Sequence, residues 1–145
     1  MHRSSAGLIA AFIATIVLSA LMILKGKLGL LPDMNVIHML ASHMGGNPIM
    51  GWVAHFTIGT VFYGLIYVLL FSDQHWGNHV LRAMLLATLG WLVMMLAIMP
   101  LMGAGLFGLG LPSGIKIPIA TLVLHLIFGA VLGTIYGTLT RRQVN

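Results

Sequence analysis

The sequence predicts an all-α integral membrane protein, a four-helix bundle formed by a single transmembrane domain over residues 1–145. Hydrophobic residues make up 59% of the chain and charged residues only 6%, with a mean hydropathy of +1.05. A soluble domain of this length cannot bury so much apolar surface. Four apolar runs reach the roughly 20 residues that a membrane-spanning helix needs, at about residues 7–24, 51–71, 81–102 and 117–139.

The first run follows Arg3 and resembles the start of a signal peptide, but it is too long and lacks a clean cleavage site of small residues. We therefore expect it to be the first helix of the bundle. Small residues recur along it at a spacing of four, which lets another helix backbone approach closely. The two stripes are Ala6, Ala10 and Ala14, and Gly7, Ala11 and Thr15.

Two connections between the runs are unusual. Residues 33–44 begin with Asp33, a candidate N-cap, and alternate apolar and polar side chains with the spacing of a short helix lying at the membrane interface. Residues 100–112 are apolar and rich in glycine, which is unexpected for a loop that meets water. This segment either folds back into the protein or extends the third helix beyond a kink at Pro100.

The second and fourth runs read as copies of each other. His55, Gly59 and Val61 align with His125, Gly129 and Val131, and after one gap Gly64, Ile66 and Tyr67 align with Gly133, Ile135 and Tyr136. Each run follows an apolar helix and a connection, so the chain is predicted to contain two parallel two-helix repeats. Such repeats are related by an axis along the membrane normal, which places His55 and His125 at one depth.

This histidine pair is the candidate functional site. A b-type haem in a membrane bundle needs two imidazoles from different helices, with small residues beside them for the flat macrocycle. His55 and His125, each followed four residues later by a glycine (Gly59 and Gly129), meet these requirements as axial ligands of haem or ligands of a metal. The alternative is that each imidazole only hydrogen-bonds a neighbouring helix.

Glycines in the fourth run indicate which face packs against another helix. Gly129, Gly133 and Gly137 form a stripe with a spacing of four, and His125 extends it by one step. Both histidines are therefore expected to face the interior of the bundle.

Composition excludes several function classes. No loop is long enough for a soluble domain, which argues against a conventional hydrolase or transferase. The only acidic side chains, Asp33 and Asp73, lie outside the spans. The sequence therefore argues against a proton relay of carboxylates across the membrane. His75 and His79 are interpreted as solvated side chains at headgroup level. The scattered basic residues suit lipid headgroups and make nucleic acid an improbable partner.

Three functions follow from these patterns. The first is a noncatalytic protein that binds haem b or a metal and carries electrons near a quinone or a partner oxidoreductase. The second is a structural or assembly subunit without a cofactor, in contact with other membrane subunits or with copies of itself. The third is a conduit for a small solute or copper, suggested by the chain's 11 methionines and requiring residues 100–112 to line a cavity.

Basic residues indicate the orientation in the membrane. Arg3, Arg82, Arg141 and Arg142 fall on the side of both termini, against Lys25, Lys27 and Lys116 on the other side. The excess of positive charge on the cytoplasmic side of membrane proteins therefore predicts cytoplasmic termini.

Three segments carry a resemblance to a known family. They are Trp52–Val61, Met99–Gly110 and Leu122–Gly133, and they include both histidines and most of the glycine-rich connection. The chain resembles a family of small four-helix bacterial inner-membrane proteins of unknown function. The resemblance implies a multi-pass protein of the bacterial inner membrane and supplies no activity.

Overall fold

The computed structural model describes residues 2–75 and 77–141. Within them, four long helices are apolar enough to cross a membrane: α1 (Arg3–Lys27), Pro48–Phe71, His79–Leu101 and α7 (Lys116–Arg141). Helix two joins α3 (Pro48–Phe56), η1 (Thr57–Phe62), α4 (Tyr63–Ile66) and η2 (Tyr67–Phe71), and helix three joins α5 (His79–Val93), η3 (Met94–Ile98) and α6 (Met99–Leu101). The described part contains no strand, so the predicted all-α four-helix membrane bundle is confirmed.

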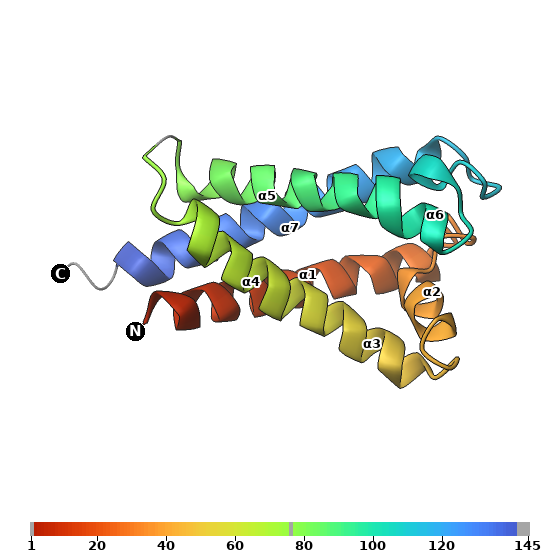
Figure 1. Cartoon of the computed structure of the whole chain (residues 1–145), viewed down its shortest axis with the longest axis horizontal. Helices are drawn as coiled ribbons and strands as arrows, with labels where there is room; N and C mark the ends of the chain where they lie inside the picture. The colour runs from red at the N-terminus through yellow and green to blue at the C-terminus, as the bar shows by residue number, and fades with distance from the viewer. Residues whose placement is uncertain (1, 76, 142–145) are drawn as a thin grey trace.

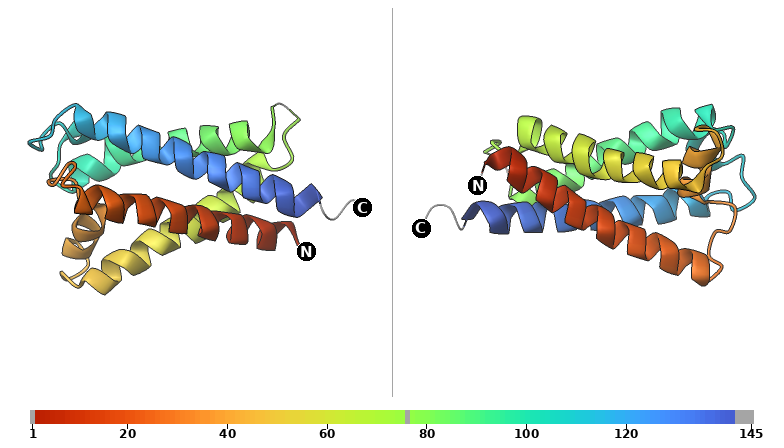
Figure 2. Two further views of the ribbon diagram at one scale, coloured as in Figure 1. Left: turned by 180° about the vertical axis from the view of Figure 1, so that it is seen from behind. Right: turned by 90° about the horizontal axis from the view of Figure 1, so that it is seen from below.

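Consecutive long helices run in opposite directions, so helix two and α7 are parallel (Figure 1). The start of α1 and the end of α7 lie at one end of the bundle, here called the terminal end. The short α2 (Val36–Ser42) and the connection after α6 lie at the opposite end, here called the loop end. Two further views show α1 and α7 side by side along most of their length (Figure 2).

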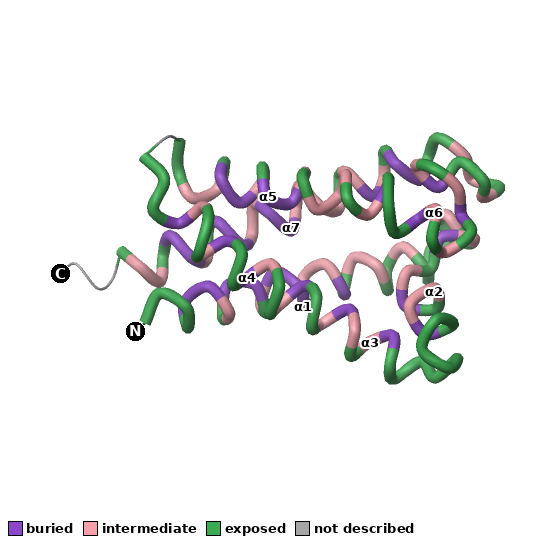
Figure 3. Tube along the Cα trace, in the orientation of Figure 1, coloured by how far each residue is buried: buried purple, intermediate pink, exposed green. Residues whose placement is uncertain are grey.

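The core is built from small side chains. Both predicted stripes of α1 are buried, from Ala6 to Thr15. Gly7 lies so close to helix two that a methyl group there would be 2.9 Å from the carbonyl oxygen of Gly64. Buried positions therefore concentrate where α1, α4, α5 and α7 meet, whereas α3 and its connection are largely exposed (Figure 3). Without water to expel, such close approach gains its stability from van der Waals contact.

Helix two buries every fourth residue. His55, Gly59 and Tyr67 are buried and Tyr63 is half-buried, and a pair of exposed residues follows each of them or the residue after it with the same period. An α-helix has 3.6 residues per turn, but η1 and η2 are π-helical and have a wider turn. The π-helical turns therefore keep these four residues, which are spaced four apart, on the same face of helix two.

The predicted interfacial helix is present as α2, but the expectation that Asp33 caps it is wrong. The cap is Asn35, whose side-chain oxygen accepts from the backbone N–H of His38 at 3.0 Å. Asp33 instead accepts hydrogen bonds from the backbone N–H of Ser113, at 2.9 Å, and from the Ser113 hydroxyl. Asp33 therefore ties the two connections at the loop end together across 80 positions of sequence.

This tether predicts a pH-dependent stability. The two hydrogen bonds from Ser113 favour the ionised carboxyl and hold the pKa of Asp33 below its usual value. A lowered folded pKa contributes stability above the unfolded pKa of about 4, and this stability is lost as the pH falls through the folded pKa. Unfolding midpoints measured between pH 7 and pH 3 should therefore show the wild type above Asp33→Asn at neutral pH and the two converging in acid. A constant difference over this range would contradict the assignment.

The glycine-rich connection folds back against the bundle and does not extend helix three. The helix ends at Leu101, and a 3₁₀ turn, η4 (Leu106–Gly108), follows. Gly103, Gly105 and Gly108 have positive φ, a region open to glycine, and so does Phe107 at +56°. Ala104 is 1% exposed. Of the two expectations for residues 100–112, the structure thus shows the nonhelical one, with Ala104 and Gly108 buried and Leu101, Leu106 and Leu109 more than half exposed.

Two equivalent positions of the predicted repeat meet in the structure. The rings of Tyr67 and Tyr136 are 5.0 Å apart with their planes at 74°. Gly59 and Gly64 contact α1, while Gly129 and Gly133 contact α5, so each repeat unit would pack its second helix on its first. The duplication itself stays a prediction.

Candidate functional site around two interior histidines

His55 is held by α1. Its Nε2 lies 3.0 Å from the Ser19 hydroxyl, and the side chain is 8% exposed. The Ser19 hydroxyl donates its single hydrogen to the carbonyl of Thr15 at 2.7 Å, so it accepts from His55. The proton of His55 therefore resides on Nε2, and the lone pair on Nδ1.

His125 has the opposite arrangement. Its Nδ1 lies 2.7 Å from the carbonyl oxygen of Thr121, one turn earlier in α7. A carbonyl oxygen only accepts, so Nδ1 carries the proton and Nε2 carries the lone pair. No described residue forms a hydrogen bond with this Nε2. Fixing one ring nitrogen through a backbone carbonyl is how proteins orient histidines that bind metals through the other.

A single residue of the neighbouring helix explains the difference. In the first half of the chain, Thr15 faces Gly59, and Ser19 follows Thr15 by four residues. In the second half, Ala83 faces Gly129, and the residue four positions after Ala83 is Ala87. Ala87 thus lies in α5 where Ser19 lies in α1, and it has no hydroxyl to offer His125.

The four candidate glycines of helix two and α7 serve helix packing. A methyl group on Gly59 would lie 2.3 Å from the Thr15 hydroxyl oxygen, and one on Gly129 would lie 2.7 Å from the carbonyl oxygen of Ala83. Gly133 and Gly137 face the start of α5 in the same way. The space beside Gly59 and Gly129 is therefore filled by neighbouring helices, and a macrocycle would have to approach the imidazoles along another face.

Tyr63 places a hydroxyl between helix two, α5 and α7. Its ring packs edge-on against Phe128 at 4.9 Å, and its hydroxyl lies over Gly90 of α5. Helical side chains point toward the start of their helix, so the Tyr63 hydroxyl extends from the level of Phe128 toward that of His125. No described residue hydrogen-bonds this hydroxyl. The Tyr63 hydroxyl and Nε2 of His125 thus each lack a hydrogen-bond partner among the described residues, and both side chains are half-buried.

A preformed metal cage is not present in the described ranges 2–75 and 77–141. No three side chains of the His, Asp and Glu types gather there. The methionines near the end of helix three pack as core residues, with Met95 at 0% and Met99 at 1% exposure, against Met34 and Ile117. Their thioethers therefore contribute to packing at this end of the bundle.

Sequence reasoning missed a second polar cluster, at the terminal end. Arg82 is 6% exposed, and its guanidinium donates to the carbonyls of Phe71 and Ser72 at 3.0 and 2.9 Å. It also donates to the carbonyl of Gln74. These carbonyls belong to the negative end of helix two and the turn after it, so the arginine acts as a C-terminal cap. A basic residue in the first turn of the next helix was the available signal.

His79 belongs to this cluster, and the expectation that it is solvated is wrong. The Tyr67 hydroxyl lies 2.8 Å from Nδ1 of His79, and the ring also packs on Tyr136 at 5.1 Å. His75, in contrast, is exposed as expected. Asp73 pairs with Arg3 on the surface of the same end. Arg142, used above for orientation, lies outside the described residues.

A family model described as "Family of unknown function (DUF6789)" matches residues 1–145. The chain belongs to this family. No curated protein and no solved structure shows significant similarity to the chain. The match covers the whole bundle, and the family description states no activity. Its four apolar helices make it a multi-pass membrane protein.

Proposed function

We propose that this member of the family is a noncatalytic membrane protein that holds a b-type haem at His125. The observation that carries the proposal is Nε2 of the half-buried His125, which has no hydrogen-bond partner among the described residues, while Nδ1 is oriented by the Thr121 carbonyl. An ionisable side chain within a span is costly and needs a partner or a role. A bound haem would supply one-electron exchange, which suits transfer to a quinone or a partner oxidoreductase in the same membrane.

The two histidines would contribute unequally. His125 is ready to act as a ligand without rearrangement. His55 would join it as a second ligand through Nε2 only after this atom leaves the Ser19 hydroxyl and its proton moves to Nδ1. Binding of a bare metal has less support, because no third His, Asp or Glu side chain joins either histidine among the described residues.

The proposal is tested by absorbance spectra of protein purified in mild detergent from a haem-replete host, oxidised and then reduced with dithionite. We expect a Soret band and sharp reduced bands that disappear in His125→Ala. Ala87→Ser should lower haem occupancy by giving His125 a hydroxyl partner, whereas Ser19→Ala should maintain or raise it by releasing His55. A colourless wild-type protein, or spectra that do not respond to His125→Ala, would contradict haem binding.

A structural or assembly subunit without a cofactor is the second candidate. It is favoured by the Ser19–His55 hydrogen bond and by the filled space beside Gly59 and Gly129, because these residues already have a structural use. In that case His55→Ala and Ser19→Ala should weaken the bundle to a similar extent, and a defined set of subunits should copurify at fixed stoichiometry.

The location in the cell is part of the proposal. The family resemblance supports the bacterial inner membrane. The distribution of arginine and lysine between the two ends supports cytoplasmic termini. The conduit for a small solute or copper receives no support from the methionines near the end of helix three, where Met95 and Met99 are packed in the core.

A further inference from the structure

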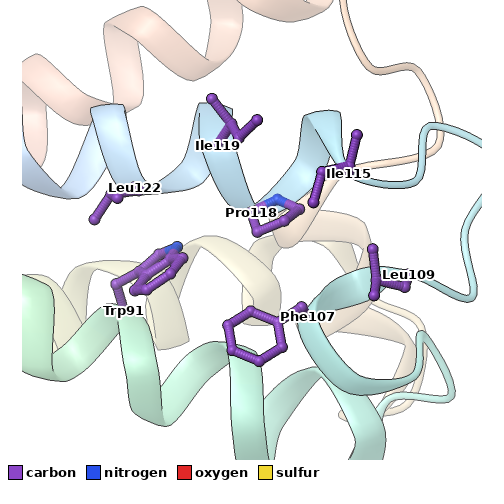
Figure 4. Close-up of a pocket in the computed structure, with 7 residues that line it drawn as sticks. All are labelled: Trp91, Phe107, Leu109, Ile115, Pro118, Ile119 and Leu122. Carbon is purple, nitrogen blue, oxygen red and sulfur yellow. The ribbon is translucent and has the colours of Figure 1, made fainter.

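An apolar hollow opens at the loop end of the bundle, between α5, the connection after α6, and α7. It has a volume of about 350 Å³. Its walls carry no polar side chain other than the indole of Trp91: they are Trp91, Phe107, Leu109, Ile115, Pro118, Ile119 and Leu122 (Figure 4). Several of these residues are more than half exposed, among them Ile115 at 64% and Ile119 at 59%, so the hollow faces the bilayer.

The walls of the hollow are held in place by specific contacts. The Trp91 indole donates to the Thr121 hydroxyl at 3.1 Å, and its ring lies 5.9 Å from that of Phe107. Phe107 adopts a left-handed backbone conformation that costs free energy for a residue with a side chain. Gly108 then passes so close to Ile117 that a methyl group on it would be 2.8 Å from the isoleucine side chain. The connection is thus bent so that an aromatic ring closes the hollow.

A charged residue is next in sequence to the residues that line the hollow. Lys116 follows the lining residue Ile115 directly, precedes Pro118 by two positions, and is exposed. It begins α7, where the helix dipole also favours an anion. No described acidic side chain pairs with Lys116, because Asp33 is bonded to Ser113 and Asp73 to Arg3. A cation at the membrane surface beside an apolar hollow matches an anionic headgroup attached to an acyl chain.

We propose that this hollow is a binding site for one anionic phospholipid, with an acyl chain between Trp91, Phe107 and Ile119 and the phosphate beside Lys116. The hollow adjoins His125, because its wall residue Trp91 donates to Thr121, but lipid binding there does not depend on haem binding. It uses the glycine-rich connection, which the histidine site leaves without a role.

Trp91 can report on this site directly. The protein, with Trp52→Phe and Trp76→Phe so that Trp91 is the remaining tryptophan, is reconstituted in vesicles that contain a small fraction of bromine-labelled lipid. The labelled lipid is either phosphatidylglycerol or zwitterionic phosphatidylcholine, in a phosphatidylcholine background. Bromine quenches indole fluorescence only at short range. We expect the site to bind phosphatidylglycerol roughly fivefold more tightly than phosphatidylcholine, which is the gain in affinity that one lysine near the membrane surface provides.

Two variants complete the test. Lys116→Gln should reduce quenching by phosphatidylglycerol to that by phosphatidylcholine, and Ile119→Phe should reduce quenching by both lipids because it fills the hollow. Lys27→Gln, at an exposed lysine of the same end, is the matched control and should change nothing. Equal quenching by the two lipids in the parent protein would overturn the proposal, as would a preference that survives Lys116→Gln. Unfolding midpoints of the variants identify any loss of fold.

Discussion

Arg82→Ala is expected to destabilise the bundle by about 2–4 kcal/mol, because it removes the guanidinium that caps the end of helix two. The carbonyls of Phe71 and Ser72 accept from this side chain, and Ser72 is only 8% exposed. Carbonyls left without a donor in a buried, low-dielectric site lose hydrogen bonds to a charged group. Titration with a denaturing detergent, followed by circular dichroism, measures the change.

Two controls accompany this prediction. Arg82→Lys keeps the charge but offers a compact ammonium in place of a planar fork, so we expect a loss smaller than that of the alanine variant. Leu85→Ala, in the same helix at a residue that is 40% exposed, should change stability much less. Equal unfolding of Arg82→Ala and the wild type would show that the buried hydrogen bonds of Arg82 contribute nothing net.

Gly133→Ala is expected to separate α5 from α7 and to cost about 1–3 kcal/mol, as overpacking of a tight interface does. The added methyl group would be 2.4 Å from the carbonyl oxygen of His79 and 2.5 Å from the Cα of Val80. Both are backbone atoms, so no side-chain rotation can relieve the contact, and the helices have to move. The same detergent titration measures the loss.

The matched control is Gly26→Ala in α1, where a methyl group meets nothing within 4 Å. Alanine favours the helix over glycine by up to about 1 kcal/mol, so this variant should be neutral or more stable than the wild type. A loss at Gly26 equal to that at Gly133 would mean that the loss at Gly133 does not arise from the α5–α7 contact.

Sequence patterns predicted the packing of helix one and the existence of α2 with useful accuracy. The stripes from Ala6 to Thr15 are buried because close helix contact requires small residues, and small residues can be recognised without coordinates. The sequence favours Asp33 as the N-cap of α2, whereas the structure has Asn35. Both residue types cap helices, and only the fold shows that Ser113 binds Asp33. His79 was misread for a related reason, since its partner Tyr67 lies in another helix.

Local composition by itself determined the number of spans, the membrane environment and the faces rich in small residues, because each of these depends on residues within one run of the chain. Only the tertiary structure decided what each histidine does. His55 and His125 occupy matching positions in sequence, but their hydrogen bonds depend on which residue of the neighbouring helix stands at their level. That residue is Ser19 beside His55, whereas the register of α5 against α7 places Ala87 beside His125, and this difference leaves one imidazole bound and the other open.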